Sequence, residues 1–227
     1  MFSCHTVVPF TPNWDDFSKK IDYGVLEEDL QAQAGQFFSE AKESLHPSFS
    51  AVVTETSDFQ KEDDSCSVTI LGNRFQGKVL SHLEGIRTVI PYIATSGKGI
   101  EQMEQGDYDS WFFDFWRDSM KVLALETARK ACSSFFKDFL HTQTLSSVNP
   151  GSGPEQLWPI AQLGMLFHSI ETFDRVDASM VRDAYMLPNK TVCGVFFSTD
   201  RPYFTCSDCQ RANCPNRKAD YHPKDIV

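Results

Sequence analysis

The chain has 227 residues, enough for one large domain or two small ones, and its 41% apolar content with 19 Phe predicts a substantial buried core. A formal net charge of −10 excludes the basic footprint of a nucleic-acid-binding protein and gives no attraction to anionic membrane surfaces. No run of 18 apolar residues predicts a membrane span, and the first residues lack the basic and apolar regions of a secretory signal. We therefore expect a cytoplasmic protein.

The N-terminal half predicts a helix followed by strands. Helical periodicity with a polar face covers residues 25–45. Strand-like runs follow at residues 49–54, 66–71 and 87–95. The acidic residues 58–64 are interpreted as a solvated loop, and Pro91 indicates a sheet edge or a bulge because proline cannot donate to a ladder.

The strongest helix signal lies between residues 107 and 140. Apolar side chains recur there at spacings close to three and four, which predicts one broad buried face made of Trp111, Phe112, Phe115, Met120, Leu123, Ala128, Cys132, Phe135 and Phe139. Because Cys132 belongs to this face, we expect it to act as a small buried apolar residue and not as a nucleophile.

The remaining chain predicts a loop, a helix and a strand. Residues 149–154 contain two prolines and two glycines and are expected to form a loop. A second helix is expected over residues 158–170, with Pro159 in its first turn, and residues 186–197 predict a turn into a strand. Residues 220–227 are expected to be loose. No linker is apparent, which favours one α+β domain over residues 1–227.

Three of the seven cysteines, Cys206, Cys209 and Cys214, form a C-x2-C-x4-C-P pattern. Thiolates this close repel one another, and zinc, an iron–sulfur cluster or a disulfide would resolve that repulsion. A metal site needs a fourth ligand, for which Cys193 and His222 are candidates, with Cys4 a third if the N-terminus folds back. A metal-free thiol cluster is the alternative.

The other cysteines are dispersed, and an odd total favours a reducing compartment. Residues 97–99, Gly-Lys-Gly, lack the spacing of a phosphate-binding loop, and no hydrolase motif is present. The sequence therefore leaves open whether the protein is an enzyme. It favours an accessory or reactivation factor over a self-contained enzyme.

Four segments, taken in order, resemble the reactivation domain of vitamin B12-dependent methionine synthase, and more closely its short free-standing relatives. Residues 93–101 are similar to A-T-x-G-x-x-[IL]-E, and residues 149–167 to S-P-G-Y-G-D-W-P-x-x-x-Q…L-F. Residues 184–194 are similar to E-S-x-A-M-x-P-x-A-S-V-S-G, and residues 206–217 to C-x2-C-x4-C-P-x-R. The resemblance spans about residues 65–217, with the Cys-rich segment at 203–217.

This resemblance implies a curved, mainly antiparallel sheet packed with long helices. It also implies a domain that binds S-adenosylmethionine and docks over cobalamin, so that cob(II)alamin can be reduced and remethylated. The cofactor-binding residues it implies are Asn149, Pro150, Gly151, Gly153, Tyr203 and Phe204; the loop offers backbone amides and the aromatic pair a stacking surface.

Two positions depart from that family. Ser147 and Ser152 stand where its loop has an arginine and a tyrosine, and a hydroxyl cannot replace a bidentate guanidinium. The acidic contact from the family's first segment also has no match here. S-adenosylmethionine is the ligand that the resemblance implies, and these departures count against it; cobalamin would be supplied by a partner.

The leading hypothesis is an accessory protein of corrinoid-dependent methyl transfer that docks on a corrinoid protein or cobalamin-dependent methyltransferase. Its cysteine cluster would carry a metal or pass electrons. The alternative is a metal-binding or sensing module on the same fold without cofactor chemistry. A self-contained S-adenosylmethionine-dependent methyltransferase ranks last, because the chain lacks a G-x-G-type loop and an obvious base.

Overall fold

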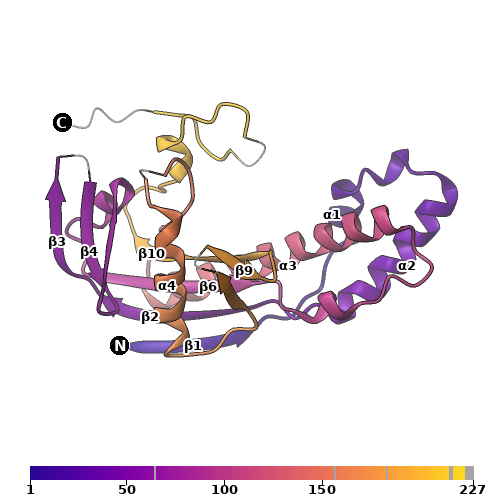
Figure 1. The fold of residues 1–227 in the computed structure, drawn as a ribbon, viewed down its shortest axis with the longest axis horizontal. Coiled ribbons are helices and arrows are strands. Elements are labelled where there is room, and N and C mark those ends of the chain that lie inside the picture. The colour runs from indigo at the N-terminus through magenta and orange to yellow at the C-terminus, as the bar shows by residue number, and fades with distance from the viewer. Residues whose placement is uncertain (64, 156, 183, 215–216, 223–227) are drawn as a thin grey trace.

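The computed structural model describes residues 1–63, 65–155, 157–182, 184–214 and 217–222, and confirms the predicted α+β class (Figure 1). A central antiparallel sheet has the strand order β1-β2-β6-β10-β7. These strands are β1 (Phe2–Val7), β2 (Ser48–Glu55), β6 (Thr88–Thr95), β7 (Leu145–Val148) and β10 (Thr191–Ser198). Two smaller antiparallel sheets are β3 (Ser57–Glu62), β4 (Ser65–Ile70) and β5 (Asn73–Gly77), and β8 (Ser179–Arg182) with β9 (Tyr185–Leu187).

The α-helices are α1 (Trp14–Lys20), α2 (Glu28–Ser44), α3 (Ser110–Phe139) and α4 (Leu163–Glu171). Side-chain caps fix two of their starts: Asn13 accepts a hydrogen bond from Asp15 N at α1, and Asp109 accepts from the first backbone amides of α3. Among the described residues, no helix is both long and apolar enough to cross a membrane.

Strict alternation along the central sheet creates two of the three apolar cores. On β10, Cys193, Val195 and Phe197 face the core that contains α4 and the β3-β4-β5 sheet. Val192 and Phe196 face the opposite core, which the second half of α3 covers. A third core joins α1, α2 and the first half of α3, at the end of the molecule that projects from the sheet (Figure 1).

The expected acidic loop at residues 58–64 is wrong over most of its length, because β3 occupies Ser57–Glu62. Gln60 pairs with Ser67 and Lys61 with Cys66 on β4. β3 is an edge strand with mostly exposed side chains, so its charges remain in water while its backbone is paired. Asp64 lies outside the described residues.

The expectation for Pro91 is also wrong, because β6 is the central strand of its sheet. The ladder to β2 passes through Ala51–Tyr92 and resumes in the same register at Thr54–Val89, so that it skips Pro91 without a bulge. The β10 ladder continues past Pro91. A central strand therefore tolerates the missing N–H when pairs on both sides hold its register.

The predicted buried face of α3 is half right. Met120, Leu123, Ala128 and Cys132 are buried, but Trp111 is 75% exposed. Three further predicted members are more exposed than buried-core residues: Phe115 (41%), Phe135 (39%) and Phe139 (44%). In their place the core takes Phe113, Trp116 and Phe136. The helix packs against other helices with its first half and against the sheet with its second half, so no single stripe describes it.

Other predicted elements differ at their ends. The second helix starts later than expected, because Pro159 precedes a short 3-10 turn and α4 itself begins at Leu163. The strands β1, β5, β7 and β8 and helix α1 had no counterpart in the sequence interpretation. The expected loose tail is described only as far as residue 222.

Candidate ligand-binding groove

A groove of about 710 Å³ lies between α3 and the C-terminal cysteine segment. We call it the α3 groove. One wall is a stripe of α3 with three- and four-residue spacing: Glu126, Arg129, Lys130, Ser133, Ser134 and Lys137. Its floor comes from β7 and β10 and includes Ser146, Ser147, Val192 and Phe196. The opposite wall is formed by the loop after β7 and by the cysteine segment.

The groove brings together most of the residues singled out in the sequence. Those that line it are Asn149, Gly153, Tyr203, Phe204, Cys206, Cys209 and Cys214, and the two departures Ser147 and Ser152 line it as well. Pro150 is buried, and neither Pro150 nor Gly151 lines the groove. The predicted metal ligand Cys193 lies on the other face of β10.

Asn149 is held by the protein itself. Its side-chain amide donates to the Tyr92 hydroxyl at 3.1 Å and to the Cys193 carbonyl at 2.9 Å. The amide reaches across β10 at Gly194, where any Cβ would overlap it. Because both bonds bind it to the sheet, we interpret Asn149 as the residue that positions the loop.

The loop after Asn149 lies against the cysteine segment. Two of its amides are already used, since Gly151 N donates to Trp158 O at 2.9 Å and Ser152 N to Asn149 O at 3.2 Å. Gly153 has a φ of +95°, and a Cβ there would lie 3.8 Å from Cys209 Cβ and 2.7 Å from a methyl of Leu157. A side chain at 153 would therefore overlap Leu157, whereas Cys209 lies at an ordinary contact distance.

Tyr203 is fixed at both ends. Its backbone N donates to Ser146 Oγ at 2.9 Å, and its hydroxyl donates to Asp208 at 2.6 Å. The ring lies against His82, with centroids 3.8 Å apart and the two planes tilted by 35°. Burial, and then the neighbouring Asp208 carboxylate, raises the pKa of Tyr203, so the phenol stays protonated. By contrast Phe204 is 41% exposed and presents a free aromatic surface.

Asp208 ties this network to the cysteines, because it lies between Cys206 and Cys209. His82 Nε2 is 3.6 Å from its carboxylate, and both side chains are 17% exposed. The sequence interpretation missed His82 and Asp208; only the tertiary fold brings residue 82 beside residue 208.

The cysteine segment is ordered by hydrogen bonds to its backbone and to one sulfur. Lys218 N donates a hydrogen bond to Cys206 Sγ at 3.4 Å. The Arg217 guanidinium donates to the carbonyls of Cys206 (3.2 Å), Cys209 (3.0 Å), Arg211 (2.5 Å) and Ala219 (3.0 Å). The arginine that ends the C-x2-C-x4-C-P-x-R pattern therefore holds the loop closed, a role that the spacing alone did not reveal.

Among the residues that the structure describes, no three His, Cys, Asp or Glu side chains are arranged to hold a metal ion. Cys193 is 1% exposed, and burial raises the pKa of its thiol. Cys4 belongs to β1, at the opposite edge of the sheet from β7. His222 is the candidate beside the loop, since its backbone N donates to Ser207 O at 2.9 Å. Pro215 lies outside the described residues.

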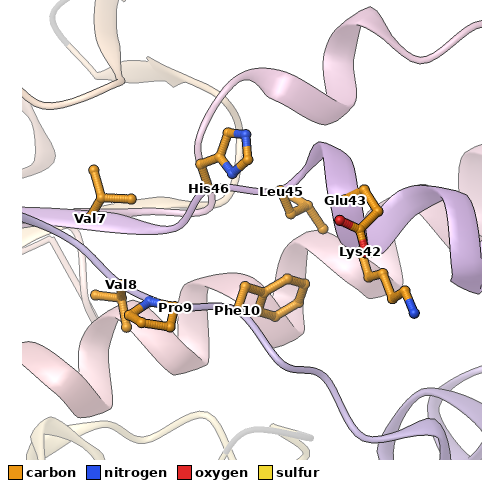
Figure 2. Close-up of a pocket in the computed structure, with 8 residues that line it drawn as sticks. All are labelled: Val7, Val8, Pro9, Phe10, Lys42, Glu43, Leu45 and His46. Atoms are coloured by element: carbon orange, nitrogen blue, oxygen red, sulfur yellow. The ribbon is translucent and has the colours of Figure 1, made fainter.

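A second hollow of about 320 Å³ lies where the chain leaves β1 and passes the end of α2 (Figure 2). Its lining combines apolar residues such as Val8, Pro9 and Phe10 with the charged residues Lys42 and Glu43. Figure 2 shows that Lys42 extends away from His46, so the polar groups of the hollow do not converge on one point. It contains none of the residues predicted from the sequence, and the α3 groove is the better candidate site.

No protein-family model matches the sequence, and no curated protein matches it either. Among solved structures, the chain is similar to the MetH reactivation domain bound to AdoHcy. That likeness covers 90% of this chain and 81% of the other, with a TM-score of 0.54 and 11% sequence identity. At this identity the similarity concerns the fold alone. The chain therefore has the α+β fold of the MetH reactivation domain.

Proposed function

We propose that this protein is an accessory factor of corrinoid-dependent methyl transfer. It docks on a corrinoid protein, with residues 1–227 acting as one unit, and supports reductive reactivation of the bound cobalamin. The observation that carries the proposal is the α3 groove. It combines the Asn149–Gly153 loop, the Tyr203–Phe204 pair and three thiols on a fold shared with a domain whose structure holds AdoHcy.

The chemistry of the groove suits an adenosyl ligand. Phe204 offers an exposed ring for stacking, while the hydrogen bonds of Tyr203 fix the neighbouring ring in place. S-adenosylmethionine would supply the methyl group for remethylation when bound. Within this function the protein's own residues bind and orient, so the chain needs no catalytic centre of its own.

The proposal is tested with a cobalamin-loaded corrinoid protein. We expect the purified chain to form a complex with it, detected by pull-down and titration, and to increase reduction of cob(II)alamin in the visible spectrum when a reductant is supplied. Phe204→Ala should weaken these effects. Phe173→Ala is the matched control, since both phenylalanines are 41% exposed and only Phe204 lines the groove. Neither complex formation nor a change in cobalt reduction would be compatible with the proposal.

A second candidate function is a metal-binding or sensing module without cofactor chemistry. The observation that favours it is the order of the cysteine loop, where Arg217 fixes the backbone and Lys218 N faces the Cys206 sulfur. Zinc or an iron–sulfur cluster would require Cys206, Cys209 and Cys214 to move closer together than they lie among the described residues, with His222 the neighbouring candidate for a fourth ligand.

Anaerobic purification followed by elemental analysis and a visible spectrum separates the two functions. The metal module requires one zinc ion or one cluster per chain, lost in Cys209→Ser and kept in Cys4→Ser, and no affinity for adenosyl compounds. A metal-free chain that still binds the corrinoid protein would exclude the module and leave the accessory function standing.

A further inference from the structure

The α3 groove is basic although the chain is acidic. The whole sequence has 31 acidic and 21 basic residues. The charged residues that line the groove are four cations, Arg129, Lys130, Lys137 and Lys218, and one acid, Glu126. A concave surface whose charge opposes that of the molecule concentrates a ligand of the opposite sign.

These cations are not neutralised by their neighbours. Among the described residues none of the four lies within salt-bridge distance of a carboxylate. The one acid of the groove, Glu126, lies 3.5 Å from Lys20 of α1. The positive charge of the groove is therefore available to a ligand.

Arg129 is distinct among the four. Its Nε is buried and has no hydrogen-bond partner among the described residues. Because this nitrogen is inaccessible, a ligand in the groove would have to bind through the terminal nitrogens of the guanidinium. The planar guanidinium also matches carboxylate and phosphate oxygens with two parallel bonds, which a lysine cannot do.

The rest of the groove limits what carries the anion. Val192 and Phe196 form an apolar part of the floor, and Phe204 is exposed on the opposite wall. A volume of about 710 Å³ is within the range of pockets for small molecules and cofactors. The ligand should therefore have an oxyanion at one end and a planar or apolar body.

We propose that Arg129 of α3 is the oxyanion anchor of the α3 groove, and that the groove takes a small molecule bearing a carboxylate or a phosphate. This inference rests on the proposed function, because it assigns the ligand chemistry of the same groove. It also accounts for Ser147, which lines the groove where the resemblance expects an arginine. The cation that the loop lacks is provided from the helix across the groove.

The experiment uses three nucleoside probes and isothermal titration calorimetry. S-adenosylhomocysteine carries a carboxylate, AMP carries a phosphate, and 5′-methylthioadenosine carries neither. We expect at least one anionic probe to bind roughly 10- to 100-fold more tightly than 5′-methylthioadenosine, the worth of a charged hydrogen bond. The stronger of the two identifies the oxyanion.

Arg129→Gln should reduce that affinity by roughly the same factor. The affinity of Arg129→Lys should be intermediate, because lysine keeps the positive charge but cannot make two parallel hydrogen bonds to one oxyanion. Arg87→Gln is the matched control, since Arg87 is paired with Glu55 on the surface, away from the groove. Equal affinity for all three probes, no binding of any probe, or unchanged binding by Arg129→Gln would overturn the proposal. If Arg129→Gln does not fold, the probe comparison on the unmodified chain decides.

The corrinoid-docking assay without any small anion reports on the proposed function separately. Docking with no anion preference would refute the role of Arg129 alone. An anion preference without docking would refute the accessory function and leave an oxyanion-binding groove.

Discussion

Asn149 donates to the Tyr92 hydroxyl at 3.1 Å across β10, and the glycine at position 194 makes this contact possible. The same amide donates to the Cys193 carbonyl. The loop that lines the α3 groove is thus attached to the middle of the central sheet through one side chain.

Replacing Gly194 with alanine should detach that side chain. The new Cβ would overlap Asn149 Nδ2 and displace both of its hydrogen bonds, so we expect the free energy of unfolding to fall by about 2–4 kcal/mol. Urea denaturation measures this loss. Gly35→Ala is the control, because a Cβ there meets no atom within 4 Å on α2 and should stabilise by about 0.5–1 kcal/mol. Equal stability of the two variants would contradict the assignment.

Gly153→Ala should crowd Leu157, whose methyl group a Cβ at 153 would overlap. Gly72→Ala serves as its partner variant, since both glycines have positive φ but a Cβ at Gly72 meets nothing within 4 Å. Both variants should lose about 1 kcal/mol to backbone strain. Only Gly153→Ala should lose about a further 1 kcal/mol of unfolding free energy, measured by urea denaturation, because Leu157 must shift. Equal stability of the two variants would show that crowding at 153 is unimportant.

Arg217→Lys should loosen the cysteine segment without unfolding the molecule. A lysine cannot reach the four carbonyls that the guanidinium joins, and the loss of about 1.5 kcal/mol would make local opening roughly tenfold more frequent. Hydrogen exchange of residues 205–214 and thiol labelling measure this opening. Arg201→Lys, at an exposed position, is the control. A globally lower urea midpoint would instead place Arg217 in the main cooperative unit.

Stability should fall as the pH rises above about 9. Burial raises the pKa of the Cys132 and Cys193 thiols above the ordinary value of 9.0, and burial and then Glu40 raise the pKa of Tyr108 to about 12. The unfolded chain therefore releases these protons first, so stability is full below pH 9 and decreases above it. The decrease is up to about 1.4 kcal/mol per pH unit for each buried thiol, and smaller for the partly exposed Tyr108 because solvent screens it.

Urea denaturation at pH 8, 9, 10 and 11 measures this slope. Tyr108→Phe should flatten its part above pH 10, where the unfolded phenol ionises but the folded one does not. A free energy of unfolding that does not change between pH 8 and 11 would contradict the burial of these groups.

Local pattern was sufficient for the long elements. Residues 107–140 were predicted as a helix and α3 spans Ser110–Phe139; the predicted strand at 87–95 is β6, Thr88–Thr95. Edge strands could not be found in this way. β1 exists because Phe2–Val7 pairs with residues 48–53, and β3 because its backbone pairs with β4 in spite of its charges. Such strands depend on distant partners and not on their own composition.

The residues of the candidate site were likewise predicted only in part. The spacing of the cysteines placed Cys206, Cys209 and Cys214 together, and the structure has all three in one groove. Cys193 was a reasonable ligand from its distance along the chain, but the alternation of β10 turns it to the opposite core. Nothing in the sequence marked Arg129 as a site residue, because a basic residue on a helix is ordinarily solvated and only tertiary packing buries its Nε.

Helix α3 has 30 residues, which gives it a length of about 45 Å. Its first half is embedded among α1 and α2, and its second half forms the wall that carries Arg129. The helix therefore belongs both to the core of the projecting helices and to the wall of the groove. Any shift of the projecting helices that moves α3 as a rigid body would therefore also move the wall of the groove that carries Arg129.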